Sequence, residues 1–241
     1  MTRLRLDQAL VQRSLVVSRS QAETYIKLGQ VTVNSIVASK PNQMVSLEDK
    51  LVVIAKEQYV GRAGLKLASV AKELGLDFRG KVVLDVGSST GGFTDYALQH
   101  GATKVIAVDV GTNQLHSSLR TDERIELYER TDIRNFNTLT PIDVVVIDVS
   151  FISLREILPS VSKLSSSKTQ IVAMVKPQFE AGAELKHKGV IKNDHMRRDI
   201  LKAFEQWVAH DFIVIAKADS KVAGEKGNLE RFYLIKKALP A

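Results

Sequence analysis

The chain contains no cysteine, and this absence excludes several kinds of functional site. Disulfide bonds, metal sites built on thiolates and cysteine nucleophiles all require cysteine. A chain without disulfides fits a cytoplasmic protein. We therefore expect a cytoplasmic protein whose functional site holds no metal.

Long apolar runs are also missing. No run approaches the roughly 20 apolar residues that a helix needs to span a bilayer. The longest, Val144–Ile147, has the length of a strand and is followed by Asp148. The first six residues, 1–6, carry arginines where a signal peptide would need its apolar core. We therefore expect no membrane partner, and a pore-forming protein is disfavoured because it would need amphipathic or spanning segments.

Acidic residues are outnumbered by basic ones. Asp and Glu number 27 against 34 Lys and Arg, which gives a net charge of +7 and an isoelectric point of about 9.5. An excess of positive charge favours polyanionic partners such as nucleic acid. The 241 residues, 44% hydrophobic and 25% charged, suit one large domain or a small domain followed by a medium one.

The first segment, residues 1–55, has the pattern of a small α+β domain. Apolar residues at helical spacing over residues 4–15, with Asp7 in the first turn, predict one helix. Ser18 is placed to cap a second helix, Gln21–Lys27. Short strand-like segments follow at residues 31–33, 36–37 and 51–54, with turns at 34–35 and 41–42.

The pattern changes after a short predicted linker, residues 56–62. A helix is predicted over Ala63–Leu74, and apolar strands then alternate with amphipathic helices. This alternation is typical of a mostly parallel, doubly wound sheet. We therefore predict an α/β, Rossmann-like fold over residues 63–241. The predicted strands are 82–85, 105–109, 144–148, 171–175, 212–216 and 232–235.

Basic residues gather on and between the first two predicted helices. They are Arg3, Arg5, Arg13, Arg19 and Lys27. Such a face can contact RNA phosphates without reading sequence, although a solvated helical surface has the same composition. The segments 5–7, 18–22 and 26–34 resemble the RNA-binding domain of the ribosomal protein S4 family, over nearly all of residues 3–54. This resemblance implies an RNA partner but not a reaction.

A loop of small residues follows the first predicted strand of the larger domain. In a doubly wound sheet, ligands bind beyond the carboxyl ends of the strands, and glycines let the backbone approach a ligand closely. A dinucleotide fingerprint would have glycine where Ser89 stands, so pyrophosphate is disfavoured. Asp85, two residues before Gly87, suits a cofactor with an ammonium group, and Asp109 after the next strand suits ribose hydroxyls. A tight turn without a ligand is the alternative.

The same loop, Asp-x-Gly-x-x-x-Gly-Gly-Phe, resembles motif I of the FtsJ-like S-adenosylmethionine-dependent methyltransferases. The resemblance implies a seven-stranded sheet, S-adenosylmethionine as cofactor, and a place for Asp132 beside its adenine. The cofactor-binding residues it implies are Asp85, Gly87, Ser88, Ser89, Gly91, Gly92, Phe93, Asp109 and Asp132.

Four charged residues form a candidate catalytic set. Methylating a hydroxyl requires alignment with the methyl donor and removal of a proton. Asp148 and Lys176 stand at the ends of predicted strands, at the cofactor edge of the sheet. Glu230 opens the last strand and lies at the same edge if that strand is antiparallel, and Lys66 could close over the site. The structural alternatives are an exposed helical lysine, a turn cap, a loop charge and an edge-strand charge.

Four segments around these residues, 61–67, 148–154, 175–180 and 227–230, resemble the TlyA (hemolysin A) family of ribosomal RNA 2′-O-methyltransferases. With the N-terminal module, the resemblance covers almost the whole chain. It implies a tetrad of Lys66, Asp148, Lys176 and Glu230, with Lys176 as the base, Asp148 and Lys66 tuning it and Glu230 orienting the group. It also implies that Gln114 contacts the cofactor and that 16S or 23S ribosomal RNA, or a ribosomal subunit, is the partner.

The chain departs from that family at two loops. Ala63 stands where many members have glycine, and the segment 221–224 lacks a common proline. Three other functions are weighed against this one: a non-catalytic RNA-binding protein, a dinucleotide-dependent enzyme, and the lytic activity that the family name suggests. Loss of Asp85, Gly87 or a tetrad residue would favour the first, and all are present.

Overall fold

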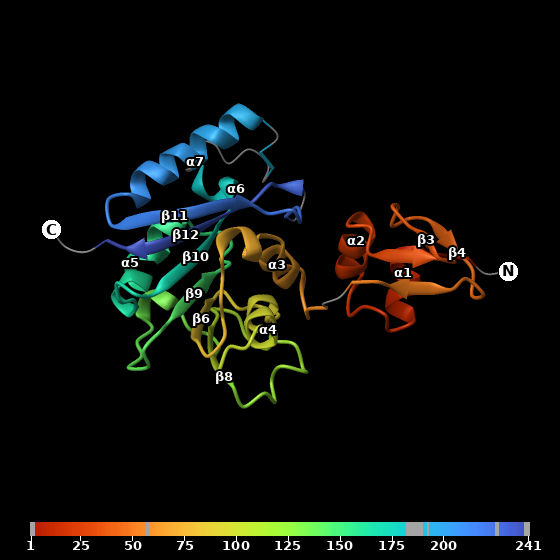
Figure 1. The fold of residues 1–241 in the computed structure, drawn as a ribbon, viewed down its shortest axis with the longest axis horizontal. Helices are drawn as coiled ribbons and strands as arrows, with labels where there is room; N and C mark the ends of the chain where they lie inside the picture. The colour runs from red at the N-terminus through yellow and green to blue at the C-terminus, as the bar shows by residue number, and fades with distance from the viewer. Residues whose placement is uncertain (1–2, 56–57, 182–189, 192, 225–226, 239–241) are drawn as a thin grey trace. The chain divides into compact units, whose positions relative to one another are not determined.

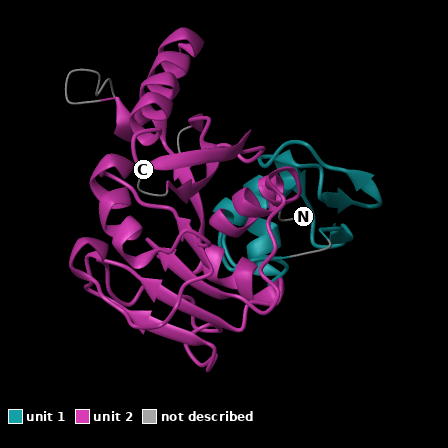
Figure 2. Ribbon diagram, turned by 60° about the vertical axis from the view of Figure 1, so that its left-hand side comes forward, with its two compact units in different colours: residues 1–62 teal, residues 63–241 magenta. Residues whose placement is uncertain are grey.

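The computed structural model describes residues 3–55, 58–181, 190–191, 193–224 and 227–238 (Figure 1). The chain divides into two compact units, unit 1 with residues 1–62 and unit 2 with residues 63–241 (Figure 2). The division falls at the end of the segment predicted as a linker. Residues 56 and 57 of that linker lie outside the described residues.

Unit 1 joins two helices to short strands, which confirms the predicted α+β module. Its elements are β1 (Leu4–Arg5), α1 (Leu6–Gln12), α2 (Arg19–Lys27), β2 (Val31–Val33), β3 (Ile36–Val37), β4 (Met44–Val45) and β5 (Leu51–Val53). Ser18 caps α2, because its side-chain oxygen accepts a hydrogen bond from Gln21 N at 3.2 Å. The first helix begins at Leu6 rather than at residue 4, because β1 pairs with β4. Strands of two residues have no period that a sequence could reveal.

Unit 2 contains a seven-stranded sheet, which confirms the predicted α/β, doubly wound fold. The strand order is β11-β12-β10-β9-β6-β7-β8. All pairs from β10 to β8 are parallel, whereas β12 is antiparallel to both of its neighbours. The strands are β6 (Val82–Val86), β7 (Lys104–Val108), β8 (Ile125–Tyr128), β9 (Val144–Ile147), β10 (Gln170–Val175), β11 (Phe212–Asp219) and β12 (Arg231–Lys237).

Helices cover both faces of this sheet (Figure 1). They are α3 (Arg62–Leu74), α4 (Gly92–Gln99), α5 (Leu154–Leu164), α6 (Pro177–Glu180), α7 (Asp194–Val208) and the short 3₁₀ helix η1 (Ile133–Asn135). Residues of α5, η1 and α7 share one buried cluster with Tyr233 of β12. Successive strand residues point to opposite faces, so Phe232 lies on the other face, where its ring is 6.0 Å from that of Phe93 in α4.

Candidate active site

Three charged residues reach one edge of the sheet from adjacent strands. Asp148 follows β9, Lys176 follows β10, and Glu230 precedes β12. Because β12 runs antiparallel to β10, with Val175 opposite Arg231, the start of β12 lies beside the end of β10. The edge where parallel strands end is where doubly wound sheets bind their ligands.

The four candidate catalytic residues form two ion pairs. Lys176 Nζ lies 2.6 Å from Asp148 Oδ1, and it donates a hydrogen bond to Ser150 Oγ at 2.8 Å. Lys66 Nζ, from α3, lies 2.6 Å from Glu230 Oε2. The structure therefore brings the helix before the first strand to the same edge as the strand ends.

These ion pairs are buried. Lys66, Lys176 and Glu230 are 6%, 8% and 2% exposed. Removing an ion from water costs several kcal/mol, and pairing offsets this cost only when the geometry is good. The burial argues against the structural alternatives of an exposed lysine, a loop charge and an edge-strand charge. Buried, paired charges in a cleft are instead typical of functional sites.

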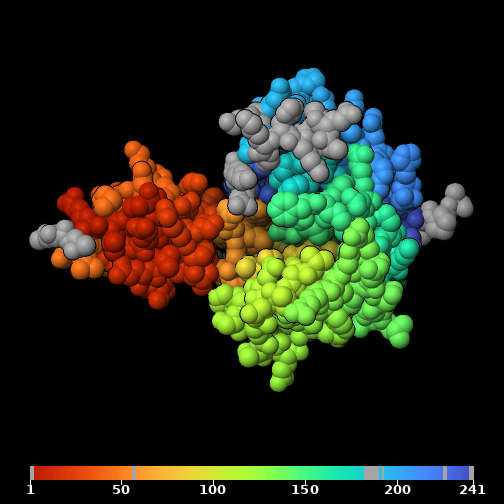
Figure 3. All heavy atoms as spheres, turned by 180° about the vertical axis from the view of Figure 1, so that it is seen from behind, coloured from red at the N-terminus to blue at the C-terminus, as the bar shows by residue number. Residues whose placement is uncertain are grey.

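A cavity of about 530 Å³ opens at the carboxyl ends of β6, β7 and β9. Its walls come from chain segments between residues 86 and 157, whose yellow-green to green atoms adjoin one another in Figure 3. Asp132 and Arg134 stand in one wall as an ion pair at 2.7 Å, and this guanidinium lowers the pKa of Asp132. The cavity brings together Gly87, Ser89, Asp109, Gln114, Asp132 and Asp148 among the predicted residues.

Asp109 links two loops in the cavity wall. Its carboxylate accepts hydrogen bonds from the backbone N–H of Ser89 at 2.8 Å and from that of Gly111 at 2.6 Å. The Ser89 hydroxyl in turn donates to Gln114 Oε1 at 3.0 Å. Three of the predicted cofactor residues are thus joined in one hydrogen-bonded wall.

Gly87 occupies a position that excludes any side chain. Its φ of +82° lies in the left-handed region, which favours glycine. A Cβ atom there would come within 2.6 Å of the backbone oxygen of Asp148. The loop after β6 and the loop after β9 can therefore approach each other only because residue 87 is glycine.

Asp85 lies beneath the loop and does not line the cavity. It is fully buried, and its Oδ2 accepts a hydrogen bond from the Thr94 hydroxyl at 2.6 Å. Within the part of the chain that the structure describes, Oδ1 has no hydrogen-bond partner. Burial raises the pKa of Asp85 to about 7, although the bond from Thr94 acts in the opposite direction.

Four predicted cofactor residues do not line the cavity either: Ser88, Gly91, Gly92 and Phe93. A Cβ on Gly92 would meet the Cβ of Ala63 at 2.8 Å, so this glycine lets α4 pack closely against α3. Phe93 is 1% exposed and packs on Phe232. Gly92 and Phe93 therefore pack against α3 and β12 rather than facing the cavity.

Two predicted RNA-binding arginines share one buried carboxylate. Asp7 is buried, and its Oδ2 lies 2.8 Å from both Arg5 Nη2 and Arg19 Nε. The hydrogen bond from Arg5 is the largest cause that lowers the pKa of Asp7, to about 2, and Arg19 adds to it. Asp7 therefore holds both guanidinium groups, which remain partly exposed.

The other three predicted RNA-binding residues differ in their environment. Arg13 donates hydrogen bonds to the backbone oxygens of Ser46, Leu47 and Asp49 at 2.6–3.1 Å. This guanidinium therefore ties a loop to α1. Arg3 and Lys27 are exposed.

Phe151 stands at the cavity without a role assigned from sequence. It is 91% exposed, lines the cavity and has a φ of +66°. Its ring lies 5.3 Å from that of Phe179 in α6. An exposed ring in left-handed backbone is unusual enough to indicate function, but only the structure shows the exposure.

Glu180 connects the two segments that carry Asp148 and Lys176. Its carboxylate accepts hydrogen bonds from the Ser153 hydroxyl at 2.6 Å and from Leu154 N at 2.7 Å. Burial raises its pKa above the usual value. The loop after β9 is thereby tied to the end of α6, which begins directly after Lys176.

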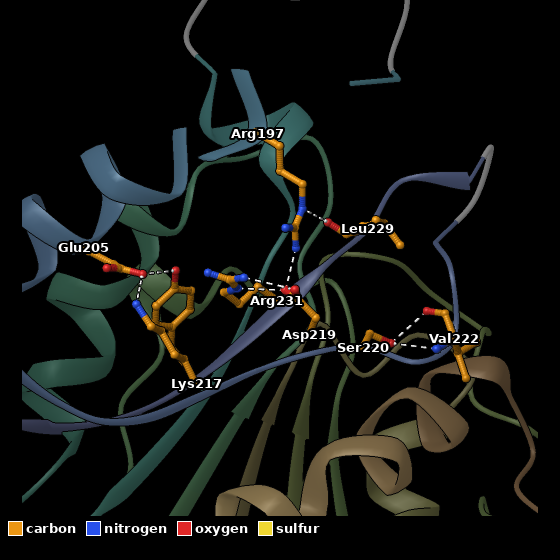
Figure 4. A network of polar contacts seen from close by, with 9 residues as sticks. Arg197, Glu205, Lys217, Asp219, Ser220, Val222, Leu229 and Arg231 are labelled. Carbon is orange, nitrogen blue, oxygen red and sulfur yellow. Dashed lines mark hydrogen bonds and ion pairs between the residues drawn. The ribbon is translucent and has the colours of Figure 1, made fainter. Parts of the chain in front are cut away.

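Arg197 of α7 restrains the backbone on the N-terminal side of Glu230. Its guanidinium donates to Leu229 O at 3.1 Å and pairs with Asp219 at 2.5 Å (Figure 4). On the other side of Glu230, Arg231 pairs with the same Asp219 at 2.7 Å. Both neighbours of Glu230 are thus connected to one carboxylate.

Two family models match the chain. The FtsJ-like methyltransferase model matches residues 59–238, and the S4 domain model matches residues 4–51. The chain belongs to the FtsJ-like methyltransferase family.

Relatives of this FtsJ-like methyltransferase match almost its whole length. It is 38% identical over 247 residues to the 23S rRNA (cytidine-2′-O)-methyltransferase TlyA of Campylobacter jejuni, covering 92% of this chain and 96% of that protein. It is 37% identical over 240 residues to the 16S/23S rRNA (cytidine-2′-O)-methyltransferase TlyA of Mycobacterium tuberculosis, covering 95% and 88%. A solved structure of a Streptococcus thermophilus protein that carries the name hemolysin shares 35% identity, with a TM-score of 0.74, over 99% and 90% of the two chains.

Family membership in the methyltransferases disfavours the dinucleotide-dependent alternative. Among the described residues, no helix of this FtsJ-like protein is long and apolar enough to cross a membrane. The same residues contain no group of three or more His, Cys, Asp or Glu arranged to hold a metal ion.

Proposed function

We propose that this protein transfers the methyl group of S-adenosylmethionine to ribose 2′-hydroxyls of 16S or 23S ribosomal RNA, or of both. The observation that carries the proposal is the buried Lys176–Asp148 pair at a cavity built from strand-end loops. The two TlyA relatives, named for rRNA cytidine-2′-O-methylation, support the substrate class. In this proposal residues 1–55 bind RNA, residues 56–62 link the domains and residues 63–241 carry out the transfer in the cytoplasm.

The cavity fits S-adenosylmethionine in two respects. Gly87 leaves backbone exposed at the wall, where a ligand can approach closely. Asp109 uses one acceptor position on each oxygen, and a carboxylate has about four, so ribose hydroxyls can still bind. When bound, the cofactor supplies a methyl group on a sulfonium, which is a strong electrophile.

Lys176 is assigned as the base that accepts the proton of the ribose 2′-hydroxyl. Its Nζ, when unprotonated, offers one lone pair and keeps two N–H groups. Asp148, 2.6 Å away, is its ion-pair partner and stabilises the ammonium that forms on proton transfer. Glu230, beside the end of β10, orients the hydroxyl, and Lys66 holds Glu230 in place.

Unit 1 supplies contacts to RNA phosphates in this proposal. Arg5 and Arg19 are oriented by Asp7 and keep exposed edges, and Arg3 and Lys27 are exposed. Contacts of this kind position a protein on RNA without reading its sequence. Arg13 is assigned a structural role instead, because it binds backbone oxygens.

Phe151 supports a nucleotide as substrate. Enzymes that act on one nucleotide take it out of its stack, and exposed aromatic rings then hold the base. The ring of Phe151 is exposed at the cavity that Asp148 also lines. A base stacked there would leave its ribose near the Lys176–Asp148 pair.

Mass-spectrometric mapping of ribose methylation in ribosomal RNA tests the proposal. Cells with the protein should carry 2′-O-methyl nucleotides that are absent from cells without it and from cells with Lys176→Ala. Lys72→Ala, an exposed lysine of α3, is the matched control and should restore the modification. Identical RNA from all four strains would refute the function, and methylation by Lys176→Ala at the wild-type rate would remove Lys176 from the role of base.

A further inference from the structure

The amine of Lys176 has a hydrogen-bond partner and an ion-pair partner among the described residues. It donates a hydrogen bond to Ser150 Oγ at 2.8 Å, whereas Asp148 Oδ1 lies 2.6 Å away without hydrogen-bond geometry. The centroid of the Phe179 ring is 5.9 Å from Nζ. Ser150 is therefore the residue that fixes one N–H direction of this amine.

We propose that Ser150 is a positioning residue for methyl transfer, which aims the lone pair of Lys176 at the substrate hydroxyl. This inference rests on the proposed function, with Lys176 as the base. Without Ser150, rotation about the Cε–Nζ bond would leave the lone pair of the neutral amine without a fixed direction. With Ser150 accepting one N–H, this rotation is restricted and the lone pair is directed.

Ser150 lies on the side of Lys176 where a substrate arrives. Ser150 is exposed and lines the cavity together with Asp148 and Phe151. Lys176 itself is buried, with only 8% of its surface exposed. Its amine therefore lies beside two residues of the cavity wall, Asp148 and Ser150.

The loop that carries Ser150 is held at two further points. The ring of Phe151 packs on Phe179, and Glu180 binds Ser153 and the start of α5. Both Phe179 and Glu180 belong to α6, which follows Lys176 directly. The separation of Ser150 from Lys176 is therefore set by contacts that do not involve either side chain.

A serine hydroxyl suits this position better than a second carboxylate would. A second negative charge beside Lys176 would favour the ammonium form and oppose its action as a base. A hydroxyl accepts the N–H without adding charge. Asp148 stabilises the ammonium once it forms, while Ser150 fixes direction.

The test measures methyl transfer to ribosomal RNA from cells that lack the protein, with the full-length chain. Ser150→Ala should lower kcat about tenfold, since misdirected proton transfer loses part of the gain from general-base catalysis. KM for S-adenosylmethionine and the Kd for RNA should remain within about twofold of wild type, because in our proposal Ser150 binds neither. Ser150→Thr keeps the hydroxyl and should recover most of kcat.

Ser153→Ala is the matched comparison on the same loop. It removes a hydroxyl that binds Glu180 and caps α5 but does not contact Lys176. It should lower Tm more than Ser150→Ala does, and kcat less. This order separates loosening of the loop from misdirection of the amine.

Two failures are distinguishable in this experiment. Wild-type kcat in Ser150→Ala, alongside an inactive Lys176→Ala, would overturn the role of Ser150 and leave the proposed function intact. An equal loss in Ser150→Ala and Ser150→Thr would also overturn it. An active Lys176→Ala, or an inactive wild-type protein, would instead refute the proposed function.

Discussion

Lys66 and Glu230 form a buried ion pair, 2.6 Å long, between the first helix of unit 2 and the start of its last strand. Their side chains are only 8% and 3% exposed. The pair therefore joins the two ends of the described part of unit 2 at the proposed active site.

Replacing Lys66 with Met should lower the free energy of unfolding by about 3–5 kcal/mol, because it leaves the Glu230 carboxylate buried without its partner. The double variant Lys66→Met, Glu230→Leu should recover much of this stability but no methyl transfer. Urea unfolding monitored by circular dichroism measures the first and a transfer assay the second. Lys104→Ala breaks an exposed ion pair with Glu126 and should cost at most about 1 kcal/mol. If Lys66→Met and Lys104→Ala lowered the free energy of unfolding equally, burial of the Lys66–Glu230 pair would not explain its stabilising effect.

Gly87→Ala should abolish S-adenosylmethionine binding and destabilise the fold. The new Cβ would collide with the backbone oxygen of Asp148 at 2.6 Å, and backbone cannot move aside as a side chain can. Isothermal titration calorimetry with S-adenosylmethionine measures the loss.

Gly75→Ala is the control for this prediction. Gly75 also has a positive φ, +63°, but a Cβ there meets nothing within 4 Å. It should cost only the roughly 1–2 kcal/mol of a left-handed residue with a side chain, and binding should be retained. Normal S-adenosylmethionine binding by Gly87→Ala would contradict the prediction, because it would show that the loops after β6 and β9 can move apart without loss of binding.

The raised pKa of Asp85 should make the free energy of unfolding fall as the pH rises from about 4 to 7. Its pKa is raised to about 7 in the folded state, so in this range the folded protein binds more protons than the unfolded chain. Stability then falls with increasing pH, by up to roughly 4 kcal/mol for a shift of about three units. Urea unfolding of wild type and Asp85→Asn between pH 4 and 8 measures the difference.

Asp85→Asn should gain stability relative to wild type toward pH 8, because the amide stays neutral while the buried carboxyl must ionise. A constant difference between the two proteins across this range would show that Asp85 does not titrate there. Thr94→Val removes the bond to Oδ2, which lowers the pKa of Asp85, and should therefore extend the fall in stability to higher pH.

Arg19→Ala should weaken RNA binding, whereas Arg13→Ala should lower the stability of the fold. Arg19 is half-exposed and bound to Asp7, and loss of one phosphate contact should reduce the slope of log K against log salt by about 0.7–0.9. Arg13 binds three backbone oxygens, so its loss should lower Tm and leave the slope unchanged. Fluorescence anisotropy with labelled RNA at several salt concentrations measures the slopes. Equal slopes for Arg19→Ala and wild type would remove Arg19 from the RNA contacts.

Much of the fold could be predicted from sequence because most of its strands are rich in apolar residues and its helices are amphipathic. β8 escaped prediction: it lies at the edge of the sheet, is only partly buried, and includes Glu126. Whether Glu230 lies at the cofactor edge of the sheet depends on the direction of the last strand, which periodicity does not reveal. The structure shows that β12 is antiparallel to β10, so Glu230 lies at that edge.

The candidate site could be predicted less completely. Strand ends locate Asp148 and Lys176, but the contact of Lys176 with Ser150 depends on the path of a loop. Motif spacing treats Gly87 and Gly92 alike, whereas one adjoins the cavity and the other a helix contact. Likewise a count of arginines cannot show that Arg13 binds backbone oxygens while Arg19 keeps an exposed edge.

The strand order has a consequence for synthesis of the protein. β12, the last of the described strands along the chain, lies between β10 and β11. Until the ribosome has released β12, β11 has no neighbour in the sheet and Lys66 has no Glu230 to pair with. Domains generally fold as units, N-terminal parts first. In the proposed function, a nascent or C-terminally truncated chain would therefore have its S4 domain available for RNA while the proposed transfer site is still unassembled, and it would occupy RNA without modifying it.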